Sequence, residues 1–477
     1  MKIAIKREQS QASLSYAERA QFGAKLNTTK LFFMAALALM TAACSNDDND
    51  LTTPQPQKAE GITITAQLAP KTYGATTRAV SDGGNKIVAE WAENEHIAIL
   101  YTVGSTKKVA DAEITAVDGS GAATITFTVE AGTPDNTACT FVYPLSAAKD
   151  DKSGVKDAST LLAAQDGTLN ANLDVRVGAG TIRTTTPGLD VTTQPAAQFA
   201  IFKFTLSGPS IDATHPLVIK DNASNKTITT VTPASTASSV YVAMPAAAST
   251  TYKFVVITAD NKYIKSGTAT IAAGNYYQTT LTMSPRYPLA LSSATADDLG
   301  AVVNSDGQMS VEKAAASGTA LGIVGKVTET GHGLILALQD APPQTWDIIN
   351  GWNSVTNYAG TTLKQLPAGA LGSLTSYLIL YPTASNPITV SSWCVAQKSD
   401  YAEIFTNLGS TTGDSNGTTY DGNVNAYITT GVGGTAMDGD YWSATEYGGR
   451  YAWGFYSYSW INYFTTGSDS VRPVLAF

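Results

Sequence analysis

The sequence predicts a mainly β protein, and three features of the chain lead to that prediction. Only 14% of the residues are charged and 43% are hydrophobic, a globular composition poor in strong helix formers. Short runs alternate apolar and polar residues, which is the period of a strand with one buried face. Turns rich in Gly, Asp, Ser and Pro separate these runs. At 477 residues, the chain is long enough for two or three domains. The predicted strands lie at 62–70, 96–103, 123–129, 139–144, 199–206, 239–245, 251–258 and 276–283.

The N-terminal region has the features of a secretion signal. Lys25 and Lys30 precede the apolar run "LFFMAALALM", which is too short to span a bilayer. The run ends in "TAAC", and this segment resembles a bacterial lipoprotein signal in which Cys44 is lipidated. The resemblance implies a signal peptide over 1–43 and an anchor in the outer membrane. Ordinary secretion, with cleavage at the Ala residues, is the alternative.

The segment after Cys44 is polar and acidic. Residues 44–60 contain "SNDDND" and then Gln and Pro residues, which predicts a flexible tether. The acidic tag resembles the surface-export signal of Bacteroidota lipoproteins, although a solvated leader explains it equally well. The whole chain has a formal charge of −9 and no basic tract after residue 30, so nucleic acid is not an expected partner.

The region 61–285 carries an ordered series of short motifs. They resemble the fimbrillin family of Bacteroidota pilins, which implies a transthyretin-like β-sandwich; an unrelated β-sandwich lipoprotein is the alternative. The motifs are "WAENEHIAI" (91–99), "ACTFVYP" (138–144), "QFAIFKFTLSG" (198–208), "SVYVAMPA" (239–246) and "GTATIAAGNYYQTTLTM" (267–283).

The fimbrillin resemblance implies a mechanism of assembly. Such pilins are cut after an Arg, which frees the first strand and opens a groove for a strand of a neighbouring subunit. Here Arg78 in "TTRAV" follows the predicted strand 62–70, in a Gly- and Thr-rich stretch. The resemblance therefore implies maturation at Arg78 and donor-strand exchange with other pilus subunits. An uncut surface arginine is the alternative.

The composition changes near residue 286. Two prolines in "SPRYP" mark a boundary, and six of the seven Trp residues follow it. The region 286–477 is predicted to hold short strands and two short helices, at 368–382 and 399–409. A long polar loop is predicted at 409–428, of the kind that often carries function.

The end of the chain carries a second resemblance. "GLILALQDA", "SSWCVAQKSDYAEIF", "DYWSATEY" and the terminal "VRPVLAF" resemble a C-type-lectin-like domain. The version is that of formylglycine-generating enzymes and of the variable proteins of diversity-generating retroelements. The resemblance implies an α+β domain in which the C-terminal segment returns through the core and a hairpin of variable residues lies on one exposed face.

That hairpin is the stretch "EYGGRYAWGFYSYSWINYFTTG", 446–467, which is rich in rings on small polar spacers. Such a mixture is typical of binding surfaces for a protein or a glycan. An aromatic core hairpin whose Tyr hydroxyls reach solvent is the alternative. Five scaffold-like residues are predicted to point inward: Trp453, Phe455, Ile461, Val471 and Val474. Besides Gly454, the outward, ligand-binding residues are then Tyr447, Arg450, Tyr451, Tyr456, Tyr458, Trp460, Asn462 and Tyr463.

An enzyme is not expected. Formylglycine-generating enzymes use a cysteine pair in this domain, and only Cys394 is present. The three histidines, His96, His215 and His332, are isolated, and we find no catalytic motif and no cofactor motif. The pairs Asp438/Asp440 and Asp414/Asn416 could bind calcium, but turn chemistry is the favoured explanation, so no metal is predicted.

Together, these features favour a surface-exposed lipoprotein of a fimbrium, with an aromatic binding face at its C-terminal end. The favoured hypothesis is a tip adhesin. A displayed receptor that never polymerises and a structural pilus subunit with an enlarged end are the alternatives.

Overall fold

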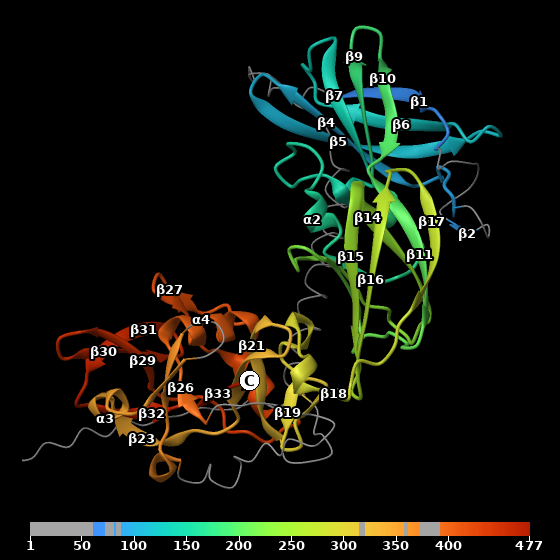
Figure 1. Ribbon diagram of the computed structural model, residues 1–477. Coiled ribbons are helices and arrows are strands. Elements are labelled where there is room, and N and C mark those ends of the chain that lie inside the picture. Colours follow the sequence, from blue (N-terminus) through green and yellow to red (C-terminus); the bar gives the residue numbers. More distant parts are fainter. Residues whose placement is uncertain (1–60, 72–80, 83–86, 314–319, 357–360, 372–391) are drawn as a thin grey trace, which may run out of the picture. The chain divides into compact units, whose positions relative to one another are not determined.

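The computed structural model is mainly β, which confirms the predicted fold class, and all eight predicted strands are present. Figure 1 shows the order of the elements. None of the helices in the described part of the chain is both long and apolar enough to cross a lipid bilayer. Cys44 and Arg78 lie outside the described residues. The structure describes residues 61–71, 81–82, 87–313, 320–356, 361–371 and 392–477.

The first sheet has seven strands in the order β1-β6-β5-β4-β7-β9-β10 and closes around its own core (Figure 1). Its two edge strands approach each other, and Ala69 donates a backbone hydrogen bond to Gln194 Oε1 at 3.1 Å. In β1, Ile64 and Leu68 point into this core as the alternation predicts. The strands are β1 (Ile62–Leu68), β4 (His96–Val103), β5 (Thr106–Val117), β6 (Ala123–Val129), β7 (Thr137–Tyr143), β9 (Arg176–Arg183) and β10 (Gly188–Ala197).

Several short elements occur along the chain between the strands of this sheet. A second apolar cluster covers its outer side, where Ala98 and Val142 contact Phe199 and Ile201. Strand β4 is therefore buried on both faces. The short elements are β2 (Ser81–Asp82), β3 (Ile87–Val88), α2 (Ala158–Leu161), η1 (Leu145–Ala147) and η2 (Ala171–Leu173).

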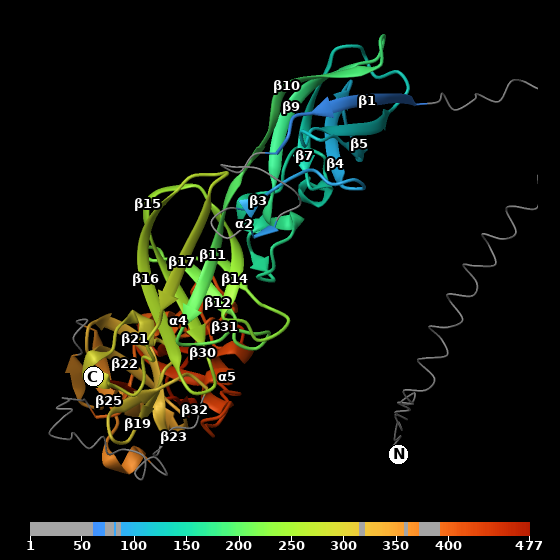
Figure 2. The same cartoon turned by 90° about the vertical axis from the view of Figure 1, so that its right-hand side faces the viewer.

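The next strands form a sandwich of two sheets, seen also in Figure 2. The three-stranded sheet has the order β14-β11-β17 and the five-stranded sheet β16-β15-β12-β13-β8. Strand β11 begins two residues after β10 ends, and β17 pairs with it in parallel. The strands are β8 (Ala164–Gln165), β11 (Phe199–Ser207), β12 (Leu217–Asp221), β13 (Thr227–Val231), β14 (Ser239–Pro245), β15 (Ala247–Ile257), β16 (Lys262–Ile271) and β17 (Tyr276–Thr282).

The C-terminal elements build a nine-stranded and a five-stranded sheet that share a core with three helices. The order of the larger sheet is β18-β20-β19-β21-β22-β33-β26-β25-β24. Its strands are β18 (Leu289–Ala290), β19 (Val302–Asn304), β20 (Gln308–Ser310), β21 (Ala320–Glu329), β22 (His332–Ala337), β24 (Ser354–Thr356), β25 (Thr362–Gln365), β26 (Cys394–Val395) and β33 (Val474–Ala476).

The smaller sheet has the order β23-β32-β29-β30-β31 and contains the aromatic hairpin. Its strands are β23 (Ala341–Thr345), β29 (Tyr441–Gly448), β30 (Tyr451–Tyr456), β31 (Ser459–Phe464) and β32 (Ser468–Val471). The other elements are α3 (Trp346–Asn350), α4 (Lys398–Asn407), α5 (Gly422–Thr429), β27 (Gly413–Asp414), β28 (Gly417–Thr418), η3 (Leu291–Ser293), η4 (Ala296–Asp298) and η5 (Ala368–Ala370).

The strand β33 is central to the larger sheet. It pairs antiparallel with β22 on one side and with β26 on the other. Just before it, the buried Arg472 lies 2.7 Å from Asp340 and donates to the carbonyls of Ala337 and Thr435. The "VRPV" segment is thus held by a buried ion pair and backbone hydrogen bonds.

The predicted helix at 399–409 is confirmed as α4, but the loop predicted at 409–428 is partly wrong. Its second half forms α5, which begins where the Asp421 side chain accepts hydrogen bonds from the amides of Asn423 and Val424. Val424 and Ile428 then bury one face of the helix. Of the helix predicted at 368–382, only the first residues are described, and they form the single turn η5.

Candidate binding surface

The aromatic hairpin is a regular antiparallel pair, β30 and β31. Its register runs without a break from Tyr451 opposite Phe464 to Tyr456 opposite Ser459. Residues directly opposite each other lie on the same face of a sheet. The register therefore divides the rings between two faces. One face holds Tyr451, Trp453, Phe455, Trp460, Asn462 and Phe464, and the other holds Ala452, Gly454, Tyr456, Ser459, Ile461 and Tyr463.

The first face is core at one end. Phe455 is fully buried, and its ring centroid lies 5.0 Å from that of Trp460. Trp460 is only 3% exposed and donates its Nε1 hydrogen to the Thr418 carbonyl at 3.0 Å. The predicted outward orientation of Trp460 is wrong, because this ring lies opposite Phe455 and packs against it. The Phe455 ring in turn contacts Tyr401 and Phe405.

The other end of the same face is exposed. Tyr447 is 54% exposed and packs edge-on against Trp453 at 5.1 Å, while Phe464 is 58% exposed and lies 4.6 Å from Tyr451. Asn462 lies opposite Trp453 and is exposed. We call Tyr447, Tyr451, Trp453, Asn462 and Phe464 the aromatic strip. Phe464 was not predicted as a site residue, although it lies two positions after Asn462 and so shares its face.

A cation borders the aromatic strip. The Lys398 ammonium, at the start of α4, lies 3.5 Å from the centre of the Trp453 ring. Partial burial lowers the pKa of Lys398, and the nearby Asp414 carboxylate opposes that shift. Lys398 was not predicted, because it lies 49 or more positions from the strip and no local pattern connects them. The strip thus offers ring faces, an amide and a positive charge.

The second face of the hairpin is smaller and partly covered. Tyr463 is half-buried, packs edge-on against Trp442 at 5.8 Å and lies over Gly454, where any added Cβ would approach its ring to 2.9 Å. Burial raises the pKa of Tyr463, and the Asp440 carboxylate adds to the shift. Tyr456 contacts Tyr458, which is 70% exposed on the turn between the strands. This face presents Tyr hydroxyls more than ring faces.

The remaining predicted residues fall at the margin of the strip or in the core. Arg450 is exposed in the turn after Gly448 and Gly449, both of which have positive φ. Val471 and Val474 are buried as predicted, while Trp453 and Ile461 are only half-buried. The predicted division between inward and outward residues therefore differs from the register at more positions than Trp460. Trp453, predicted inward, lies on the same face as Tyr451 and Asn462. Ile461, also predicted inward, lies on the same face as Tyr456 and Tyr463.

Of the oxygen-rich candidates, Asp414 stabilises a turn. Asp414 accepts hydrogen bonds from the backbone amides of Asn416 and Trp460, so it fixes β27 against β31. Among the residues that the structure describes, no three His, Cys, Asp or Glu side chains come together as a metal-binding group. His96 and His215 each pair with an aspartate on the surface, at 2.7 and 3.1 Å.

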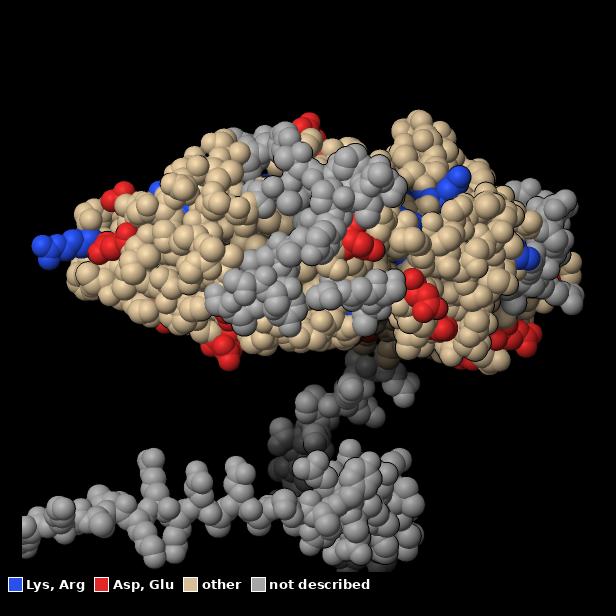
Figure 3. Space-filling view, turned by 60° about the horizontal axis from the view of Figure 1, so that its bottom comes forward, with Lys and Arg blue, Asp and Glu red and all other residues tan. Residues whose placement is uncertain are grey.

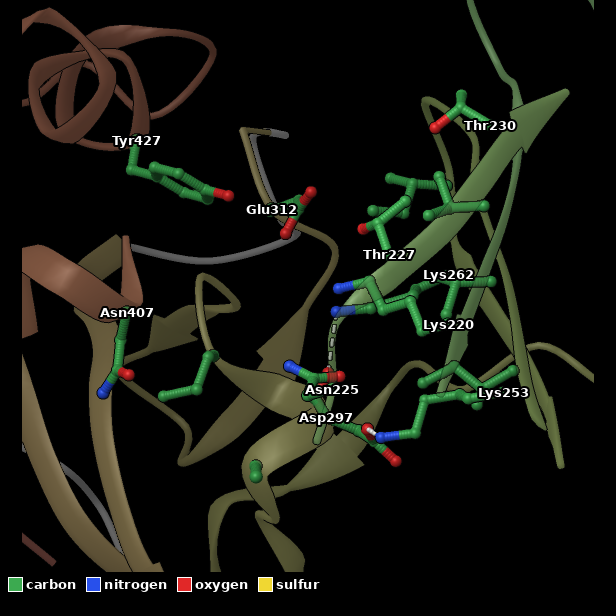
Figure 4. Close-up of a pocket in the computed structure, with 16 residues that line it drawn as sticks. Lys220, Asn225, Thr227, Thr230, Lys253, Lys262, Asp297, Glu312, Asn407 and Tyr427 are labelled. Atoms are coloured by element: carbon green, nitrogen blue, oxygen red, sulfur yellow. Dashed lines mark hydrogen bonds and ion pairs between the residues drawn. The ribbon is translucent and has the colours of Figure 1, made fainter. Parts of the chain in front are cut away.

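The charged side chains are thinly spread on the face drawn in Figure 3, where most of the surface is neither acidic nor basic. A separate polar cavity of about 370 Å³ is lined by strands of the sandwich and by Glu312, Asn407 and Tyr427. Figure 4 shows the amino groups of Lys220 and Lys262 turned into it. Lys262 donates to the Asp297 carbonyl at 2.7 Å, and burial lowers its pKa. The cavity carries charges of both signs, so it favours no single class of ligand.

Comparison with known proteins gives only distant likenesses. No family model and no curated protein matches this chain. A fimbrial protein from Bacteroides ovatus is 11% identical, with 88% of this chain and 99% of that chain covered, at a TM-score of 0.24. A fimbrial assembly protein from Parabacteroides distasonis is 12% identical, with 46% of this chain and 90% of that chain covered, at a TM-score of 0.26. The minor pilin of Streptococcus agalactiae is 9% identical, with 48% of this chain and 99% of that chain covered, at a TM-score of 0.22. Scores this low carry no argument about the fold or the function of this chain.

Proposed function

We propose that this chain is a lipoprotein anchored through Cys44 in the bacterial outer membrane, and that it acts at the tip of a fimbrium as an adhesin. The observation that carries the proposal is the aromatic strip. Its exposed rings stand on a regular hairpin whose inner end is fixed in the core by Phe455 and Trp460. Rigid aromatic side chains supply contact area at small entropic cost, which suits a binding surface.

The proposed ligand is a protein or a glycan that lies across the strip. Ring faces pack against sugar C–H groups or against apolar side chains, while Asn462 and Arg450 supply hydrogen bonds. Strand β33 returns to the centre of the nine-stranded sheet. That return agrees with a lectin-like domain over 286–477, which we propose as the host of this surface.

The proposed partners within the fimbrium are other pilus subunits. Strand β1 is an edge strand that pairs with β6 along its whole length, from Ile62 opposite Val129 to Leu68 opposite Ala123. Its inward residues cover buried apolar residues of β6, among them Ile125 and Phe127. A strand that replaced β1 after a cut at Arg78 would find backbone partners and apolar pockets, as donor-strand exchange requires.

The proposed position is the tip. Strand β33 has a partner on each side, so it cannot be given to a neighbouring subunit without taking the nine-stranded sheet apart. The chain can thus accept a strand in the place of β1, while β33 is not free to act as a donor.

Binding of the full chain to arrays of bacterial-surface glycans, mucin glycans and displayed proteins tests the site. We expect Tyr447→Ala with Phe464→Ala to weaken binding at least about tenfold, since exposed ring contacts at hot spots contribute roughly 1.4 kcal/mol or more. The matched control is Tyr456→Ala with Tyr458→Ala on the other face, which should leave binding unchanged. Loss of binding in the control pair alone would place the ligand elsewhere and overturn the proposal.

Immunogold labelling of whole cells tests the position. Label at the ends of fimbriae supports the adhesin at the tip. Label along the shafts would make the chain a structural subunit, and label on the cell surface away from fimbriae would make it a displayed receptor.

A further inference from the structure

A buried lysine follows the first strand. Lys71 lies three residues after β1 ends and is only 4% exposed. Its ammonium lies 3.8 Å from the centre of the Tyr143 ring and 4.4 Å from that of the Trp91 ring. Two aromatic faces at these distances stabilise a cation. We call Trp91, Glu95, Tyr143 and Asp174 the lysine box.

Two carboxylates complete the box. The Lys71 ammonium lies 3.3 Å from Asp174 Oδ2 and 3.4 Å from Glu95 Oε2. Asp174 is fully buried, and its Oδ2 atom is the one that faces the ammonium. Arg176 binds the other oxygen, Oδ1, at 2.8 Å. The buried Asp174 carboxylate is therefore shared between Arg176 at one oxygen and the Lys71 ammonium at the other.

The box is built by residues outside the β1 segment and is held rigid. The Tyr143 hydroxyl donates to Glu95 Oε1 at 2.6 Å, and the Ala92 amide donates to Glu95 Oε2 at 3.1 Å. The Trp91 Nε1 hydrogen binds the Ala69 carbonyl at 2.9 Å, which fixes the backbone just before Lys71. Because the Tyr143 and Ala92 bonds do not involve the β1 segment, Glu95 stays in place when that segment leaves, and the Asp174 Oδ2 atom then loses its ammonium partner.

The two motifs that the sequence singled out in this region meet here. "WAENEHIAI" supplies Trp91 and Glu95, and "ACTFVYP" supplies Tyr143. The Trp91 indole, the Glu95 carboxylate and the Tyr143 phenol all face the segment that follows β1. Both motifs therefore contribute side chains to one site, and that site surrounds an ammonium group.

We propose that the lysine box is a binding site for a primary ammonium group, and that it selects which strand can lie beside β6. In this chain, Lys71 follows Leu68, the last buried apolar residue of β1, by three residues. A strand that replaces β1 must carry a lysine at the same spacing. This inference rests on the proposed strand exchange. Burial lowers the pKa of Lys71, and Asp174 and Glu95 oppose that shift. The two carboxylates thus act to keep the group charged.

The test uses the full chain with a specific protease sequence introduced between Lys71 and Ser81 and cut there. The probe is a fluorescent peptide with the sequence of residues 61–71, and its affinity is measured by anisotropy. We expect Lys71→Met in the peptide to weaken binding at least tenfold, because methionine has a similar length and no charge. The matched control is Gln67→Met, which changes an exposed residue of β1. A loss for Lys71→Met no larger than that for Gln67→Met would overturn the inference.

A second measurement separates this inference from the proposed function. If no peptide enters the cut chain, strand exchange is refuted, and the box is tested in the uncut chain by hydrogen exchange. Lys71→Met should then speed exchange of the β1 amides at least tenfold, compared with Lys107→Met, which removes an exposed ion pair with Asp151. Equal rates in the two variants would refute the ammonium site itself.

Discussion

The substitution Trp460→Ala tests whether this ring is core or surface. The sequence pattern places Trp460 outside, whereas the structure buries it against Phe455 and bonds it to the Thr418 carbonyl. Removing the indole would leave a cavity between β30, β28 and α4. It would also remove the hydrogen bond that holds the strand of Thr418 against β31.

The expected cost follows from these contacts. Replacing a buried Phe or Trp by Ala costs about 3–5 kcal/mol. Tyr447→Ala, which removes an exposed ring from the neighbouring strand β29, should change stability by no more than about 0.5 kcal/mol. Since about 1.4 kcal/mol corresponds to a tenfold change, Trp460→Ala should speed opening of this sheet between roughly a hundredfold and a few thousandfold.

Hydrogen exchange of the β30 and β31 amides measures the opening of these two strands separately from the unfolding of the other sheets. Tyr447→Ala is the matched variant, because it removes a ring from the same face. If Trp460→Ala speeds exchange less than about fivefold, or if Tyr447→Ala speeds it as much, the division of the hairpin into a core end and a surface end is refuted.

Three further outcomes are expected. Gly454→Ala should destabilise the C-terminal sheets by about 1–3 kcal/mol in thermal unfolding, because the new Cβ meets the Tyr463 ring. Burial raises the pKa of Cys139 to about 12, so alkylation at pH 8, followed by peptide mapping, should be about a thousandfold slower than for a free thiol. Burial raises the pKa of Tyr441 to about 12, so its protonated form stabilises the fold fully below about pH 10. Urea unfolding should lose that contribution between about pH 10 and 12, and Tyr441→Phe should make the loss of stability in this range smaller.

The strands were predictable where local alternation is strong. The buried positions of β1 follow the alternation, since one side chain in two faces a core. In β11 the alternation begins only at Lys203, because the first four residues lie between two apolar clusters and are all buried. Strand β9 was missed because its sequence, "RVGAGTIR", has glycines where apolar residues are expected. The structure gives the reason: at Gly180 a Cβ would lie 2.6 Å from the Phe141 ring and 2.7 Å from a carbonyl of β10. The neighbours that require glycine are distant in the sequence.

The candidate site was predictable in its location and only partly in its orientation. The density of rings at 446–467 marks the hairpin, but no local signal fixes the register that sets Trp460 opposite Phe455. The cover over that pair comes from Thr418 and Tyr401, 42 and 59 positions away. Lys398, at the start of α4, likewise contacts the strip from a distant part of the sequence. Long-range packing decides which rings are free.

The division of one hairpin face between core and surface bears on how such a surface could change its specificity. Tyr447, Asn462 and Phe464 are exposed, so substitutions there alter what the strip contacts while the buried area of the domain stays nearly constant. Phe455 and Trp460 are fixed by the core, and Gly454 is fixed by the ring above it. A diversified surface built on this hairpin is therefore expected to vary at the strip and to keep these three positions. A set of selected binding variants that changed Trp460 as freely as Tyr447 would contradict that division.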